Sequence, residues 1–418
     1  MFLLLWLLLL GVSLVAQPGL SSHDRDLVLV MLRRARADVE KHYYDPTFHG
    51  VDLKAELGRA AQRLKTAPSL PDAFSIVADF LERFDDSHTA FIPPSLGRRV
   101  DYGWQMAVVG DRTLIVHVDP NSDAAARGLS PGDRVLLLNA VTPSRANVSR
   151  LFYYYRFIRP QARQRIAVLK PDGSAQTIDV ASRVSNRAAV DQGDLVTEID
   201  QLIERGRDRT AAVGERVLVW KMAVFGRPES VDAVIAKARR YDTLVLDLRG
   251  NGGGAVTALQ ELVSRCFDRE VVVAIETRRD GRPTREVARP ARSAFTGRLI
   301  VLVDSRSASA SEMFARIVQI EARGTVIGDR TAGAVMRSHL FPHQADLTSA
   351  VAFYATSVTV ADVRMSDGGS LEKTGVEPDE VVLPRPSDLA AGRDPVLAHA
   401  IGLAGGSITP EEAGGLFK

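Results

Sequence analysis

The sequence predicts a mixed α/β protein in which an N-terminal helical region and a β-rich domain precede an α/β core. Residues 24–85 repeat apolar residues at helical spacing, and residues 98–182 alternate short apolar strands with turns. From residue 216 onward strands and helices alternate, a pattern typical of a largely parallel sheet. The 418 residues, 45% of them hydrophobic, suffice for two or three domains with a sizeable core.

The first residues predict an export signal. Residues 2–16, FLLLWLLLLGVSLVA, form an apolar run that a polar stretch follows, so we expect a signal peptide over residues 1–17, with cleavage near Ala16. The mature protein would then be periplasmic or extracellular. The alternative is an uncleaved membrane anchor formed by residues 2–16, although a bilayer span needs about 20 apolar residues. The single cysteine, Cys266, excludes an intramolecular disulfide, and its helical spacing favours the core.

Residues 18–97 form the predicted helical region. The apolar spacing predicts helices over residues 27–44, 55–64 and 69–84. Ser69 stands three residues before Asp72, a capping-box pattern that marks the start of the third helix. One face of that helix is apolar, so we expect it to pack into a core rather than to hold a cofactor.

The β-rich domain, residues 98–182, contains the stretch NSDAAARGLSPGDRVLLLN, residues 121–139. Its alanines suit a short helix, Gly128 suits the helix C-cap, and SPGD is a turn that leads into a strand. The segment resembles a PDZ domain. PDZ domains bind the end of an extended chain by strand addition, and the resemblance puts the carboxylate-binding loop at Tyr102, Gly103 and Trp104. The alternative is a purely structural β module.

A polar connector, residues 183–215, leads into the α/β core, residues 216–385, and a helical tail follows over residues 386–418. The predicted core strands cover residues 216–225, 243–248, 271–276, 299–304 and 325–329, and the predicted helices cover residues 229–240, 256–266, 311–323 and, in the tail, 394–404.

Charge and histidine spacing disfavour several classes of function. The chain has 53 basic and 51 acidic residues, a net charge of +2, and no long basic run, so we expect no nucleic-acid partner. The eight histidines show no ligand spacing, and we expect neither a metal nor a cofactor. Peptides or other small substrates are the expected partners, and a membrane is expected only if residues 2–16 stay uncleaved.

A glycine run, DLRGNGGG at residues 247–254, directly follows a predicted buried strand. Backbone amides exposed at a strand end suit an oxyanion hole, where they approach a developing alkoxide. Gly250, Gly252 and Ala255 also match a dinucleotide-binding spacing, with Glu276 near the place of a ribose-binding acid. We favour the oxyanion hole, because a dinucleotide fingerprint rarely follows a strand that ends in Asp and Arg.

A second pattern, residues 299–324, reads as a strand, a turn rich in small hydroxyl residues, and a helix. A serine just before a helix N-terminus exposes its hydroxyl beside free amides and the positive end of the helix dipole. This arrangement suits a serine nucleophile. Serines in such turns are often only helix caps, and the pattern alone leaves that alternative open.

LVLDLRGNGGG, SASASE and GVEPD occur in this order behind the PDZ-like and helical segments. Together they resemble the C-terminal processing peptidases, or tail-specific proteases, and their tricorn-core relatives. The resemblance covers nearly all of the mature chain and implies a ClpP/crotonase-like core. It also implies a serine endopeptidase that acts through an acyl-enzyme, with Ser309 as the nucleophile. The oxyanion amides would belong to Ala310 and to Gly253 or Gly254.

The sequence departs from the processing peptidases at the general base. Those enzymes activate the serine with a lysine, and the matching segment here is TAGAV, residues 331–335, where Ala334 takes the place of the lysine. A Ser/Lys dyad at that position is therefore excluded.

The stretch RFDDSHTAF, residues 83–91, offers a substitute base in His88, since imidazole accepts a proton near neutral pH. In the tricorn-like relatives a Ser-His pair and a glutamate form the relay. Ser87 and His88 match that pair, and Glu372 matches the acid, with Asp367 and Glu377 as nearby rivals. The alternative function is a catalytically silent peptide- or ligand-binding member of the same family.

Overall fold

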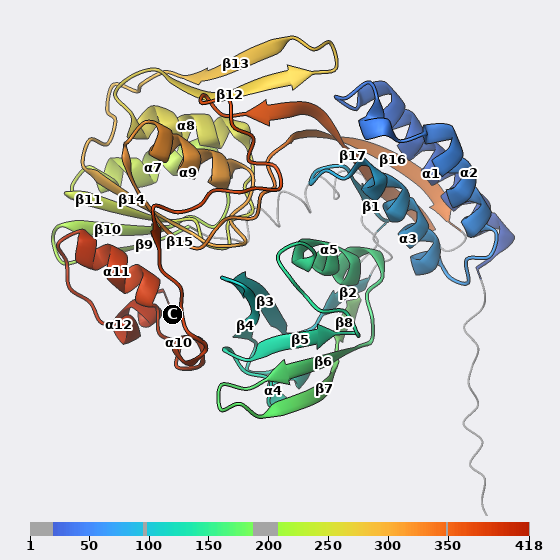
Figure 1. Cartoon of the computed structure of the whole chain (residues 1–418), viewed down its shortest axis with the longest axis horizontal. Coiled ribbons are helices and arrows are strands. Elements are labelled where there is room, and N and C mark those ends of the chain that lie inside the picture. Colours follow the sequence, from blue (N-terminus) through green and yellow to red (C-terminus); the bar gives the residue numbers. More distant parts are fainter. Residues whose placement is uncertain (1–19, 95–97, 187–207, 348–349, 418) are drawn as a thin grey trace, which may run out of the picture.

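The computed structural model describes residues 20–94, 98–186, 208–347 and 350–417 and has a mixed α/β fold with several sheets (Figure 1). This confirms the predicted fold class at that level. The predicted signal, residues 2–16, and the middle of the predicted connector lie outside the described residues. Within the described ranges, no helix is long and apolar enough to cross a membrane.

Three helices form the N-terminal region, as the apolar spacing predicts. Each begins at a side chain that accepts a backbone N–H, namely Ser21, Asp52 and Ser69. The helices are α1 (Ser22–His42), α2 (Leu53–Leu64) and α3 (Leu70–Leu81), and the short turns are η1 (Phe48–Gly50) and η2 (Glu82–Phe84). Their apolar faces form one cluster, which also contains Tyr354 and Val358 of the core. The region therefore packs on the core and is not an isolated domain.

The β-rich domain is a five-stranded antiparallel sheet in the order β3-β4-β5-β6-β7. Its elements are β3 (Trp104–Val109), β4 (Arg112–Val118), α4 (Asp123–Ala126), β5 (Arg134–Leu138), α5 (Val148–Tyr153), the π-helical turn η3 (Tyr154–Ile158), β6 (Arg163–Leu169) and β7 (Ala175–Ala181). A separate antiparallel pair, β2 (Arg98–Asp101) and β8 (Arg183–Asn186), comes directly before and after these strands in the sequence. Among the described strands, β3 pairs only with β4 and β7 only with β6, so these two are the edge strands of the sheet.

The core contains a six-stranded sheet in the order β18-β15-β14-β11-β10-β9, parallel except at β9. The strands are β9 (Arg209–Val213), β10 (Val217–Lys221), β11 (Thr243–Asp247), β14 (Arg298–Val303), β15 (Gly324–Gly328) and β18 (Glu380–Val381). One face packs on α7 (Pro228–Ala238), α8 (Val256–Cys266) and α9 (Ala310–Ile320). The other packs on α11 (Pro395–Leu403) and α12 (Pro410–Gly415), beyond the short α10 (Pro386–Ala390) (Figure 1).

A second, antiparallel sheet extends the core toward the N-terminal helices, with the order β1-β17-β12-β13 and β16 paired to β17 (Figure 1). Its strands are β1 (Ala90–Ile92), β12 (Val271–Arg278), β13 (Pro283–Ala288), β16 (Arg337–Leu347) and β17 (Ala350–Arg364). The assignment of residues 271–276 to the parallel core sheet is therefore wrong. A strand's own apolar pattern does not specify its partner, and β12 pairs with β13 and β17 instead.

Candidate active site

Ser309 lies at the N-cap of α9, directly after the turn that follows β14. Its backbone has φ 54° and ψ −118°, a conformation that a residue with a side chain rarely adopts. The backbone N–H of Ser309 donates to Ala334 O at 3.0 Å and to Glu312 Oε2 at 3.1 Å. This one N–H is thus shared between two acceptors, which helps to maintain the unfavourable backbone conformation at Ser309.

Glu312 holds this turn from inside the protein. Its fully buried carboxylate accepts hydrogen bonds from Ser309 N, from Thr331 Oγ1 at 2.6 Å, from Gly333 N at 2.7 Å and from Ala334 N at 2.9 Å. Burial raises the pKa of Glu312, and the four donors act in the opposite direction. Sequence analysis missed this residue, although its position three residues after Ser309 is the capping-box signal.

Asn251 connects the glycine run to the serine turn. Its backbone oxygen accepts from Ala308 N at 3.0 Å and from Ser311 Oγ at 2.9 Å. Its side-chain Oδ1 accepts from Gly253 N at 2.9 Å, and Nδ2 donates to Met222 O. The residue is fully buried, so these bonds fix the two loops in register. Nothing in its local pattern distinguished it from a loop asparagine.

Gly253 approaches Ser309 more closely than any residue with a side chain could. Its φ is 100°, and a Cβ built on it would lie 2.7 Å from Ser309 Cβ and 3.1 Å from Ala310 N. The Gly253 amide already donates to Asn251. Among the described residues, no acceptor is found for the amides of Gly254 and Ala310. Of the predicted oxyanion amides, these two are the ones that remain open.

Ser87, His88 and Glu372 form a hydrogen-bonded chain. Ser87 Oγ lies 2.8 Å from Glu372 Oε2 and 2.7 Å from His88 Nδ1, and Ser87 N donates to Glu372 Oε1 at 2.8 Å. An ionised carboxylate only accepts, so the single hydroxyl proton of Ser87 points to Glu372 and its lone pair accepts from Nδ1–H. This tautomer leaves Nε2 of His88 unprotonated and able to accept a proton.

One peptide unit joins Ser309 to this chain. The carbonyl of Ala334 accepts from Ser309 N, and the N–H of the same peptide unit, that of Val335, donates to Glu372 Oε2 at 2.9 Å. The segment that carries the lysine in the processing peptidases therefore links the serine turn to the acid. Within the described part of the chain, Ser309 Oγ and the His88 ring do not hydrogen-bond directly.

The rival acids have other partners. Asp367 accepts from Arg316 and from its own turn at Gly369, and Glu377 forms an exposed pair with Arg330. Lys373 binds Asp85 at the surface. The geometry therefore singles out Glu372 as the acid that contacts Ser87.

Of Tyr102, Gly103 and Trp104, which the sequence predicts to bind a chain end, the first two hydrogen-bond within the protein. Gly103 N donates to Asp101 Oδ1 at 3.0 Å, and Tyr102 OH donates to Tyr155 O and accepts from Gln161 N. Trp104 begins β3, an edge strand of the sheet. The Gly103 amide is thus not free to hold a carboxylate.

The dinucleotide alternative requires Glu276 as the acid that binds a ribose. Glu276 is buried on β12, where its carboxylate accepts from Arg337 and Arg278. Because this carboxylate is almost fully buried and already pairs with two guanidinium groups, it is not presented to a ribose, and the geometry does not support a dinucleotide site at GNGGGA.

Residues 217–382 match the model of peptidase family S41. Over these residues, less than half of the chain, the protein is similar to that family. Together with the likeness to the processing proteases, this similarity supports a serine-type peptidase. The protein is 25% identical over 387 residues to a carboxyl-terminal-processing protease of Picosynechococcus sp., an alignment that covers 87% of this chain and 84% of that protein.

Two further comparisons show what the chain is similar to. It is 25% identical to a tail-specific protease of Haemophilus influenzae, over 78% of this chain but only 48% of that longer protein. Its fold is similar to that of mature CPAF complexed with lactacystin, with a TM-score of 0.64 at 16% identity, over 88% of this chain and 95% of that one. At this identity the likeness to CPAF concerns the fold alone.

Proposed function

We infer that this protein is an exported serine endopeptidase that cleaves peptide bonds in proteins or peptides through an acyl-enzyme. In this proposal Ser309 is the nucleophile, His88 is the general base, and Glu372 acts on His88 through Ser87. The hydrogen-bonded chain from Glu372 through Ser87 to His88 carries the proposal, because it holds the imidazole in the tautomer that a base requires.

In the acylation step Ser309 Oγ attacks the peptide carbonyl while His88 Nε2 takes the hydroxyl proton. The carbonyl oxygen becomes an alkoxide that accepts hydrogen bonds from the amides of Ala310 and Gly254. His88 then gives the proton to the leaving amine, and the carbon–nitrogen bond breaks. Glu372 and Ser87 stabilise the imidazolium that exists between these two transfers.

Deacylation follows the same steps, with water as the nucleophile and Ser309 as the leaving group. His88 takes a proton from the water that attacks the acyl-enzyme, the same two amides hold the second alkoxide, and the proton returns to Ser309 Oγ as the ester bond breaks. No metal or cofactor enters either step.

Protein substrates fit the β-rich domain as well as the site. We propose that it is PDZ-like and that the open edge of β3 receives an extended chain end by strand addition. The domain contacts the serine turn directly, since Ser305 Oγ donates to Val108 O at 2.6 Å. Export rests on the apolar run at residues 2–16, and either cleavage or membrane anchoring there is compatible with this role.

The test of the nucleophile is labelling by a fluorophosphonate probe, with the modified peptide mapped by mass spectrometry. We expect the label on Ser309 and not on its neighbours Ser307 and Ser311, whose hydroxyls are buried and donate to Leu248 O and Asn251 O. Ser309→Ala should abolish labelling. Absence of label from the wild-type protein, in conditions where a control hydrolase reacts, would favour the silent binding protein instead.

At low pH, the dependence of kcat/KM on pH should be determined by His88 and Glu372. Burial lowers the pKa of His88 below 6.5, with Asp86 acting against this shift and Arg337 adding to it, whereas burial raises the pKa of Glu372 above 4.5. Protonation of His88 removes the base, and protonation of Glu372 removes the acceptor that sets the tautomer of His88 through Ser87. We therefore expect kcat/KM to fall as the pH is lowered, with the step that belongs to His88 at a lower pH than for an ordinary imidazole. A midpoint at or above 7 in a steady-state assay would contradict the assignment.

A further inference from the structure

We propose that the N-terminal helical region supplies part of the active site: Tyr43 fixes Asp86, and Asp86 is a second carboxylate that positions His88 and faces it with a negative charge. The inference rests on the proposed function, since it assigns a positioning residue to the same base. Asp86 directly precedes Ser87 and His88 in the sequence, and it also bonds to Tyr43 and to Thr359 of β17.

The carboxylate of Asp86 accepts several hydrogen bonds in and around the loop that carries His88. Its Oδ1 accepts from His88 N at 2.9 Å and Thr89 N at 2.7 Å, which closes the turn around the base. The same oxygen accepts from Thr359 Oγ1 of β17 at 2.6 Å. Oδ2 accepts from Tyr43 OH at 2.8 Å. One carboxylate thus joins the loop, the second sheet and the end of α1.

Tyr43 is held as firmly as the group it binds. The residue is fully buried at the C-terminal end of α1, its ring packs against Phe48 and Phe84, and Arg279 Nη1 donates to its carbonyl at 2.8 Å. Burial, and then the neighbouring charge of Asp86, raise the pKa of Tyr43, so its hydroxyl keeps its proton and remains a donor.

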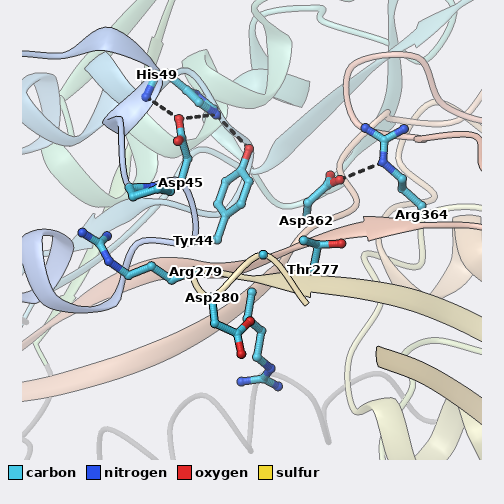
Figure 2. A pocket seen from close by; sticks show the side chains of 11 residues that line it. Tyr44, Asp45, His49, Thr277, Arg279, Asp280, Asp362 and Arg364 are labelled. Atoms are coloured by element: carbon cyan, nitrogen blue, oxygen red, sulfur yellow. Dashed lines mark hydrogen bonds and ion pairs between the residues drawn. The ribbon is translucent and has the colours of Figure 1, made fainter. Parts of the chain in front are cut away.

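A second contact from the same region holds the start of the loop. His49 Nδ1 lies 2.7 Å from Phe84 O. Its other ring nitrogen lies 2.8 Å from Tyr44 OH, and Figure 2 draws this second contact. His49 has φ 52°, and Asp45 accepts its backbone N–H, so bonds on both sides maintain an unfavourable conformation. This turn lines a pocket of about 560 Å³, next to Thr277 and Asp362 of the second sheet (Figure 2).

The two carboxylates near His88 act in different ways. Glu372 reaches the ring through Ser87 and sets its tautomer, whereas Asp86 is the nearby negative charge that favours the imidazolium. The opposing charge is Arg337 on β16, which Glu276 and Glu286 partly neutralise. The remaining contact is neutral, since Ser357 of β17 donates to the His88 carbonyl. Asp86 therefore offsets part of the burial that disfavours a charged base.

Asp86→Asn removes the negative charge of this side chain while its hydrogen bonds can be kept. The amide oxygen can keep the three bonds of Oδ1, and Tyr43 OH can turn to accept from the amide nitrogen, so the loop should keep its course. We expect kcat on a fluorescein-labelled casein to fall about tenfold with KM nearly unchanged, because one pKa unit of imidazolium stabilisation corresponds to tenfold. The acid limb should move to lower pH. Tyr43→Phe should lower kcat severalfold, whereas Tyr154→Phe, which loses only a bond to Ser75 of α3, should not.

A measurement without catalysis separates this inference from the proposed function. In Ser309→Ala protein, the His88 pKa followed by proton NMR should be lower when Asp86→Asn is added. An inactive wild-type protein would overturn the proposed function and leave this pKa comparison interpretable. The inference is overturned if the His88 pKa is the same with and without Asp86→Asn, whether or not kcat falls, since an unmoved pKa reduces Asp86 to a packing role.

Discussion

His88→Ala is expected to lower kcat on labelled casein by on the order of 10⁴-fold, the upper range for the loss of a positioned general base. The serine hydroxyl alone is barely ionised at neutral pH, and Ala334 offers no amine in the place of the family's lysine. KM should change little, because the imidazole contacts the reacting hydroxyl and not the rest of a long substrate. Circular dichroism and the melting temperature would verify that the fold is intact.

The double variant sharpens this prediction. Residues that act as one unit are not additive, so His88→Ala with Ser309→Ala should be no slower than Ser309→Ala alone. Lys373→Met is the matched control: it removes the amine nearest to Glu372 in sequence, and with it only an exposed ion pair to Asp85, worth about 0–1 kcal/mol. Full activity of His88→Ala, or a collapse in Lys373→Met, would refute histidine as the base.

The local pattern of a strand, a small-residue turn and a helix indicates a serine before a helix, and the structure has β14 and α9 on the two sides of Ser309. The choice of Ser309, His88 and Glu372 as the candidate residues depended on the resemblance to the processing peptidases and their tricorn-like relatives. The structure connects Ser87, His88 and Glu372 by hydrogen bonds, across 285 residues of sequence between Ser87 and Glu372. Their catalytic roles remain predictions for the variants above.

The bonds that hold these side chains could not be read from the sequence, because they join backbone groups of distant segments. The Ala334–Val335 peptide unit contacts both Ser309 and Glu372, yet any pair of small residues would supply the same groups. Asn251 and Asp86 act through oxygens whose partners lie on other elements. For the same reason the partner strands of β12 were mispredicted: pairing is a property of the assembled sheet.

The oxyanion hole and the serine turn also depend on each other in a way that one methyl group can test. Gly253→Ala is expected to lower kcat by on the order of 10² to 10³-fold, the loss expected when an oxyanion donor is displaced. The new Cβ would lie 2.7 Å from Ser309 Cβ and 2.9 Å from Ala308 O, and φ 100° is unfavourable for alanine. Either the glycine run or the serine turn must move.

Gly252→Ala is the control that the chain itself provides. It adds the same methyl group one residue earlier, where no atom lies within 4 Å and φ is not positive, so hydrolysis and fluorophosphonate labelling should stay near the wild-type rates. Gly253→Ala should lose both, since a displaced Ser309 or Ala310 impairs attack on either reagent. If the two variants behave alike, the close approach of Gly253 to Ser309 is not what maintains the site, and the oxyanion amides must be sought elsewhere than at Gly254 and Ala310.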